Sequence, residues 1–266
     1  MNSIQGANEP IVLLDDSGDG IVTLTLNRPD KRNALSAPMI AKLKSLLDGI
    51  ADDRSIKVVI LAANGPAFSS GHDLKELRAL PSEVAQRELF MACSRMMTTI
   101  VRLPQPVIAQ VRGIATAAGC QLVASCDLAF ADDDARFGTP GVNIGLFCST
   151  PAVALARAVS TKHAMEMLLT GDMVDAQTAF RFGLVNRVVP PSALEGVVLD
   201  MARKIASKST DTIAKGKAAF YRQVELDLDS AYAFTSEIMA RTMMTDDAKE
   251  GIDAFLEKRR PEWHGR

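Results

Sequence analysis

The chain has 266 residues, a formal net charge of -2 and an isoelectric point near 6.0. Such a balanced charge gives no bulk-charge support for a nucleic-acid partner. The sequence contains no apolar run of about 18 residues, the minimum for a membrane-spanning helix. With 47% hydrophobic residues, the length allows one large core and a smaller appended region.

The four cysteines lack the paired spacing of a metal site, and a domain of this size needs no disulfides for stability. We therefore predict free core thiols in a reducing compartment, and no metal. Residues 1–10 contain neither an apolar segment nor an Arg-rich amphipathic pattern, so no targeting peptide is predicted. The expected location is the cytoplasm, or the mitochondrial matrix if the sequence is a mature eukaryotic form.

Strands and helices alternate in the first half of the chain. Turn-rich residues 15–20 separate the first two predicted strands and indicate a hairpin. Ser36 has the character of a helix N-cap, and Pro38 falls in the first turn. Strands are expected over 11–14, 21–26, 58–62, 107–111 and 128–131, and helices over 36–51, 83–102 and from the turn at Gly113 to about 125. This order predicts an α/β fold with buried sheets.

The second half is mostly helical. Ser160 and Gly171 bracket one predicted helix, Asp175 and Gly183 bracket the next, and Ser192 with Glu195 fits a capping box. Helices are expected over 160–170, 176–182, from 192, 210–224, 228–244 and 247–259, with a strand over 185–189. We predict a core over 1–190 and a helical region over 191–266, packed together as one unit.

Two segments have the same local pattern, in which a short apolar strand leads into a small-residue turn and then a helix. They are Ala67–Leu74 and Gly113–Leu122. Such turns leave backbone N–H groups unpaired at a helix start, where the helix dipole also favours an anion. Two turns converging on one carbonyl oxygen would form an oxyanion hole, which is often the largest single term in acyl chemistry.

Four ordered segments resemble signature motifs of the crotonase superfamily, also called the enoyl-CoA hydratase/isomerase family. The resemblance extends from Ile11 to Trp263 and rests on Asn27–Leu35, Ala67–Leu74, Gly113–Asp127 and Ala254–Arg259. Two further segments, Ala117–Gln121 and Gly145–Pro151, resemble one subgroup more closely. The resemblance implies a crotonase-like ββα superhelix with a C-terminal helical trimerisation region, assembled as a homotrimer or a dimer of trimers. It also implies a CoA thioester as substrate or ligand and no other cofactor.

The resemblance assigns roles residue by residue. The backbone N–H groups of His72 and Ala118 would bind the thioester oxygen. Backbone near Ala34 and Ser70 would frame the adenine. The remaining substrate-binding candidates are Lys31, Arg32 and Lys75 for the CoA phosphates, Lys258 for the adenine-ribose end (from a neighbouring subunit in some members), and Asp73, Leu74, Cys148 and Phe255.

The family's hydratases carry glutamates at the positions that match Gln121 and Gly141, and these two carboxylates hold the water and transfer the protons. An amide cannot titrate, and glycine has no side chain. Because general acid–base groups contribute about 10²–10⁴-fold each, hydration of an enoyl-CoA should be very slow. The sequence therefore predicts an acyl-CoA enzyme that stabilises a thioester enolate, for which decarboxylation or thioester hydrolysis stays open. The alternative is an acyl-CoA-binding protein without chemistry.

Three other side chains allow two interpretations each. His72 is either a structural histidine or a group that acts through its imidazole. Cys148 is either a buried apolar thiol or a nucleophile, for which His72 is the available base. Asp73 fits an N-cap beside the first turn better than it fits a catalytic acid.

Overall fold

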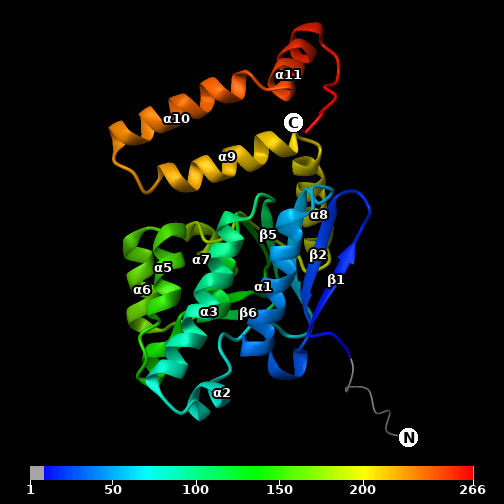
Figure 1. Cartoon of the computed structure of the whole chain (residues 1–266). Coiled ribbons are helices and arrows are strands. Elements are labelled where there is room, and N and C mark those ends of the chain that lie inside the picture. Colours follow the sequence, from blue (N-terminus) through cyan, green and yellow to red (C-terminus); the bar gives the residue numbers. More distant parts are fainter. Residues whose placement is uncertain (1–8, 266) are drawn as a thin grey trace, which may run out of the picture.

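The computed structural model of the chain describes residues 9–265 and contains two sheets surrounded by helices (Figure 1). Strands of the larger sheet are β1 (Val12–Asp16), β2 (Ile21–Leu26), β3 (Val58–Ala63), β5 (Val107–Val111), β7 (Leu128–Asp132) and β10 (Arg187–Val189). Those of the smaller sheet are β4 (Ala67–Ser69), β6 (Ile114–Thr116), β8 (Arg136–Gly138) and β9 (Val174–Asp175). The helices are α1 (Ala37–Asp52), α2 (Leu74–Ala79), α3 (Glu83–Arg102), α4 (Ala118–Ser125), α5 (Ser149–Ala158), α6 (Thr161–Thr170), α7 (Ala176–Phe182), α8 (Leu194–Ala206), α9 (Thr210–Gln223), α10 (Leu228–Met243) and α11 (Asp246–Glu257), with short 3-10 helices at Pro29–Lys31 and Pro140–Ile144.

Parallel pairing dominates both sheets. In the larger sheet β1 pairs with β2 as an antiparallel hairpin, and the strands then follow in parallel in the order β2-β3-β5-β7-β10. In the smaller sheet β4, β6 and β8 are parallel, and β9 is antiparallel to β8. A parallel sheet is usually covered on both faces, which explains why β3 and β5 are almost continuously apolar.

Alternate residues of β3 serve two cores. Val59 and Leu61 belong to the main core, which also contains the inner faces of α1 and α3. Val58 and Ile60 point to the opposite face, where α8 covers the sheet. This alternation is the two-residue period of a strand. Since α8 packs on β2, β3, β5 and β7, the helical half of the chain begins inside the core. The predicted division near residue 190 stays a prediction.

Much of the predicted secondary structure is confirmed. The helices over 83–102, 161–170 and 176–182 and the hairpin of β1 and β2 lie where the sequence places them. Gly171 and Gly183 end their helices in the left-handed conformation. Ser192 is wrong as an N-cap, because α8 begins at Leu194 after Ala193, which makes no capping hydrogen bond. The helix expected after the first small-residue turn is α2, whereas the second sheet and α5 were not predicted.

The absence of a targeting peptide was predicted from residues 1–10, and eight of these lie outside the described residues. Within residues 9–265, none of the helices has both the length and the apolar character that crossing a membrane requires.

One buried ion pair fixes α9 to the core. Lys217 on α9 donates to Asp127 at 2.7 Å and to the carbonyls of Ile100 and Gln105. The same carboxylate accepts the Tyr221 hydroxyl at 2.9 Å. Beyond this anchor, α10 and α11 extend away from the sheets (Figure 1).

We predict that Lys217→Met lowers the free energy of unfolding by about 3–5 kcal/mol, because it leaves the part-buried carboxylate of Asp127 without its cation. Tyr221→Phe removes one hydrogen bond to the same carboxylate and should cost about 1–3 kcal/mol. Urea unfolding of the two variants, with the exposed pair mutant Arg241→Met as control, measures this. Equal stabilities of Lys217→Met and the control would show that the anchor contributes nothing.

Candidate functional site

The first small-residue turn connects β4 to α2. Gly71 has a φ of +84°, which glycine adopts without strain. Asp73 is the N-cap of α2, and its carboxylate accepts hydrogen bonds from the N–H groups of Lys75 and Glu76. The prediction that Asp73 is a cap is therefore confirmed, since the cap occupies its side chain.

Two buried polar side chains that the sequence analysis missed hold this turn. Asn33, in the segment of the first family motif, donates to the carbonyls of Asn64 and Ala67 at 2.8 Å each. Ser69 donates to the carbonyl of Asn33 at 2.9 Å and accepts the N–H of Gly71. An asparagine inside an otherwise surface-like motif was the available signal. These bonds bring the segment containing Ala34 against the turn that contains Ser70.

The second turn connects β6 to α4 and has an unusual backbone. Ala117 has φ +50° and ψ -118°, a backbone conformation that residues with a side chain rarely adopt. Its N–H donates to the carbonyl of Gly138 at 2.9 Å, which ties the turn to β8. Such conformations cost of order 1–3 kcal/mol and persist where the surroundings impose them.

Glycines let the two turns touch. A Cβ added to Gly119 would lie 2.2 Å from the carbonyl oxygen of Ser69, and one added to Gly71 would lie 3.1 Å from the N of Ala118. Among the described residues, neither the N–H of His72 nor that of Ala118 has a hydrogen-bond acceptor. Two free donors on adjacent turns, one of them at the start of a helix, are suited to a partially negative oxygen.

Gln121 lies one turn into α4, with its side chain 4% exposed and its Oε1 atom unpaired among the described residues. Gly119 faces β4, and two helical residues correspond to a rotation of about 200°. Gln121 is therefore directed away from β4.

The imidazole of His72 is held neutral. Its ring packs edge-on against Phe90 of α3 with the centroids 5.2 Å apart, and its Nε2 atom is buried without a partner in the described structure. Burial lowers the pKa of His72 to about 4, because the charged form would lose its hydration.

Cys148 fills the space that a side chain at Gly141 would need. A Cβ at Gly141 would lie 2.8 Å from Cys148 Sγ and 2.2 Å from the carbonyl oxygen of Leu146. Burial raises the pKa of the Cys148 thiol. A nucleophilic cysteine needs the opposite shift, so the structure favours the interpretation of Cys148 as an apolar thiol that fills this corner.

The predicted CoA-binding residues fall into two groups. Lys31, Arg32, Leu74 and Lys75 are exposed beside the first turn. Phe255 and Lys258 lie on and after α11, at the end of the molecule opposite α2 (Figure 1). Within one chain the structure therefore brings the first group, but not the second, to the paired turns.

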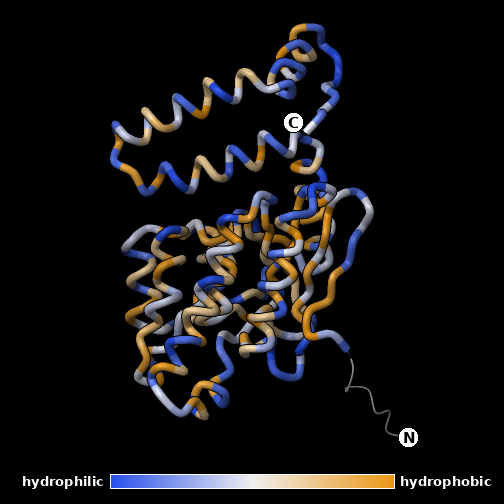
Figure 2. The backbone as a smooth tube through the Cα atoms, in the orientation of Figure 1, coloured by the Kyte–Doolittle hydropathy of each residue, from blue (hydrophilic) through white to orange (hydrophobic). Residues whose placement is uncertain are grey.

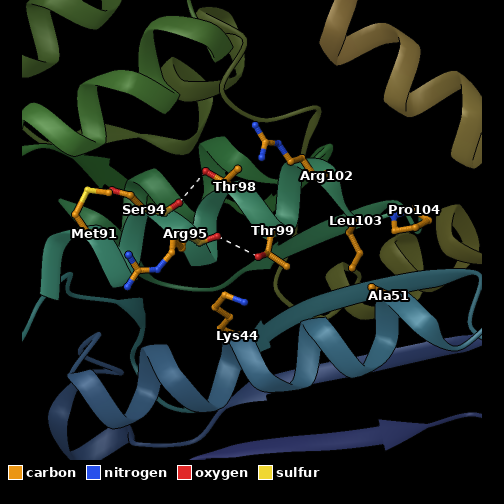
Figure 3. A pocket seen from close by; sticks show the side chains of 10 residues that line it. All are labelled: Lys44, Ala51, Met91, Ser94, Arg95, Thr98, Thr99, Arg102, Leu103 and Pro104. Carbon is orange, nitrogen blue, oxygen red and sulfur yellow. Dashed lines mark hydrogen bonds between the residues drawn. The ribbon is translucent and has the colours of Figure 1, made fainter. Parts of the chain in front are cut away.

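A surface groove of about 540 Å³ runs between α1 and α3 and contains none of the predicted site residues (Figure 3). Lys44, Arg95 and Arg102 border it. Its two threonine hydroxyls are satisfied within α3, where Thr98 and Thr99 donate to the carbonyls one turn earlier. Lys44 pairs with Asp48. No unpaired buried polar atom of the described chain lines this groove, so it has less of the character of a binding site than the paired turns.

Comparison with known proteins decides the family. Residues 16–266 match the family model described as enoyl-CoA hydratase/isomerase. The chain belongs to this family. A rat protein named "Enoyl-CoA hydratase domain-containing protein 3, mitochondrial" is 50% identical over 96% of this chain and 85% of its own length. The solved structure of an enoyl-CoA hydratase from Mycobacterium smegmatis is 56% identical and superposes with a TM-score of 0.94, covering 96% of this chain and all of that one.

The subgroup resemblance is confirmed as well. The crystal structure of human enoyl-CoA hydratase domain-containing protein 3 has 50% identity and a TM-score of 0.93, covering 96% of this chain and 100% of the human one. The segments Ala117–Gln121 and Gly145–Pro151, which carried that resemblance, are the start of α4 and the loop that fills the corner at Gly141. The crotonase-like fold predicted from the sequence is likewise confirmed.

We predict that Gly119→Ala destabilises the protein by about 1–3 kcal/mol and separates the two turns, because its Cβ would overlap the Ser69 carbonyl. Gly49 on α1 is the matched control. It is exposed and has no neighbour within 4 Å of an added Cβ, so Gly49→Ala should be stabilising by about 0.5–1 kcal/mol. Denaturant unfolding measures both. A Gly119→Ala protein as stable as its Gly49→Ala counterpart would contradict the close approach.

Proposed function

We propose that this protein binds acyl-CoA thioesters and polarises the thioester carbonyl with the N–H groups of His72 and Ala118. The observation that carries the proposal is the pair of acceptor-free donors on turns held in contact by Gly71 and Gly119. Donors fixed in place before the ligand arrives stabilise the negative charge of an enolate or tetrahedral oxygen without reorganisation. The family relationship supports the same ligand class.

The cationic side chains beside the first turn are the proposed contacts for the CoA phosphates. Lys31 and Arg32 sit at and after a short 3-10 helix, and the hydrogen bond from Ser70 to the Arg32 carbonyl, at 3.0 Å, ties that segment to the turn. Ala34 is next to Leu35, whose N–H donates to the Gly71 carbonyl at 2.8 Å. An adenine framed by backbone near Ala34 and Ser70 would then lie beside Lys75.

We predict that acetyl-CoA and crotonyl-CoA bind in isothermal titration calorimetry, and that Lys31→Ala/Arg32→Ala weakens both by about tenfold or more at low salt. The substitution Lys162→Ala, on the exposed face of α6, is the control and should change neither affinity. Absence of binding heat and of any thermal shift at millimolar ligand would overturn the proposal.

Proton transfer is the step for which the site lacks groups. Gln121 cannot accept a proton, and the space beside Gly141 is filled by the Leu146 carbonyl and the Cys148 thiol. These two features favour a second candidate function, an acyl-CoA-binding protein that performs no reaction. Turnover and binding scored separately on a panel of CoA thioesters distinguish the two.

Crotonyl-CoA hydration, followed by loss of the enoyl thioester absorbance, should be at least about 10²-fold slower than for a hydratase with both glutamates. Gln121→Glu should raise this rate, since it adds one titratable group near the paired turns. Gly141→Glu should add no further gain, because its Cβ would collide with the Leu146 carbonyl. If the double variant hydrates crotonyl-CoA much faster than Gln121→Glu does, with unchanged CoA affinity, the loop that contains Leu146 moves to make room for the new side chain.

Assembly as a trimer or a dimer of trimers is part of the proposal. The outer helices and the turn between them expose a series of large apolar side chains: Phe220, Val224, Leu228, Tyr232, Met239 and Met243. Along α9 and α10, hydrophobic stretches of the backbone alternate with hydrophilic ones (Figure 2). A monomer rarely leaves so many exposed together. Multi-angle light scattering should give a mass of three or six chains of 28.6 kDa, and a stable monomer at micromolar concentration would contradict it. The word "mitochondrial" in the name of the rat relative supports the mitochondrial option for the compartment.

A further inference from the structure

Residues 258–265, which we call the return segment, run from the end of α11 back to the junction of α8 and α9 (Figure 1). The indole N–H of Trp263 donates to the carbonyl of Ser207, at the end of α8, at 2.9 Å. The ring of Trp263 also covers Gly251 on α11, where an added Cβ would lie 3.2 Å from two ring carbons. One side chain therefore bridges α11 and the end of α8.

A buried carboxylate makes a second attachment at the same junction. Asp247, in the first turn of α11, is 1% exposed. It accepts the hydroxyl of Ser209 at 2.5 Å, and it accepts the N–H groups of His264 and Gly265 at 2.7 and 3.2 Å. Ser209 is also the N-cap of α9. A carboxylate is costly to bury unless hydrogen bonds of this kind satisfy it, so Asp247 fixes the start of α11 in one place.

The turn into the return segment holds a lysine in an unfavourable backbone conformation. Lys258 ends α11 with a φ of +56°, where helices usually place a glycine. The next residue, Arg259, makes paired hydrogen bonds to the carboxylate of Glu250 at 2.5 and 2.8 Å, which holds this turn closed. Lys258 is exposed, and within residues 9–265 no carboxylate forms an ion pair with it. The turn therefore presents an unpaired cation at a fixed point.

We propose, on the basis of the acyl-CoA binding proposed above, that Trp263 and Asp247 are positioning residues for Lys258. They hold the ammonium group of Lys258 where it meets the adenine-ribose end of a CoA bound at the paired turns of a second copy. Neither Trp263 nor Asp247 touches the ligand. Their effect on affinity passes through the orientation of α11.

The arrangement of the outer helices explains why α11 needs these attachments. Without them, α11 is joined to the rest of the chain through α10, in which Ala231 is the only buried residue of the described helix. A helix held only in this way would have to be ordered when the ligand binds, and that ordering reduces affinity. The loss should affect only ligands that carry the adenosine portion of CoA, because the thioester end binds to another part of the fold.

The test compares crotonyl-CoA with crotonyl-pantetheine, which lacks the adenosine portion. Dissociation constants are measured by calorimetry on the wild-type protein and on variants of the full chain. Lys258→Ala should weaken crotonyl-CoA by about fivefold or more and leave crotonyl-pantetheine unchanged. Trp263→Ala and Asp247→Ala should reproduce this pattern, and Trp263→Phe, which keeps a ring over Gly251, should retain part of the affinity. Lys249→Ala, at an exposed lysine of the same helix, is the control and should change neither constant.

A double-mutant cycle on crotonyl-CoA separates positioning from a general loss of structure. If Trp263 acts through Lys258, the variant Lys258→Ala/Trp263→Ala binds no more weakly than Lys258→Ala alone. Additive losses overturn the proposal, and so does a Trp263→Ala protein that loses both ligands equally or that changes its mass in light scattering. A Lys258→Ala protein with wild-type affinity for crotonyl-CoA also overturns it, while the proposed function stands. Failure of the wild-type protein to bind crotonyl-CoA overturns the proposed function, and this inference with it.

Discussion

The approach of α4 to β4 is the contact on which the candidate site depends. Gly119 lies against the Ser69 carbonyl with no room for a methyl group, and a Cβ added to Gly71 would lie 3.1 Å from the N of Ala118. The bonds of Asn33 and Ser69 fix one side of this contact, and the bond from Ala117 to Gly138 fixes the other. A strained alanine backbone is retained between them. The two free N–H groups are adjacent because all these constraints act together.

The proposed site has two backbone donors that suit a carbonyl oxygen, and it lacks the two carboxylates that the family resemblance associates with proton transfer. The backbone donors need only the fold, whereas acid–base groups need side chains at two positions of α4 and the loop before α5. At the first, an amide replaces a carboxylate. At the second, glycine has no side chain, and the Leu146 carbonyl and the Cys148 thiol fill the corner. The two departures are therefore physically different, because Gln121 keeps a buried polar group, whereas at Gly141 there is no space for a side chain.

Sequence patterns identified the elements with strong periodicity or clear caps. The buried strand β3 was visible as an apolar run, and α6 and α7 were visible from Ser160, Asp175 and their terminal glycines. Strands of two or three residues, such as β6 and β9, have no period to detect, so the second sheet was missed. Similarly, the family motifs indicated His72 and Ala118, but the supporting bonds of Asn33 depend on tertiary contacts that local patterns do not encode.

The position of α11 gives the candidate site a dependence on assembly. The ion pair of Lys217 and Asp127 holds the inner part of α9, and past it α10 and α11 project beyond the sheets. Phe255, with 81% of its surface exposed, lies far from the turn of His72 in its own chain. If Phe255 and Lys258 contact the ligand, they contact the ligand that is bound at the paired turns of a second copy of the chain. The exposed apolar bands of the outer helices provide the surface for such an association, and in that case ligand affinity and subunit association are linked, since each stabilises the other.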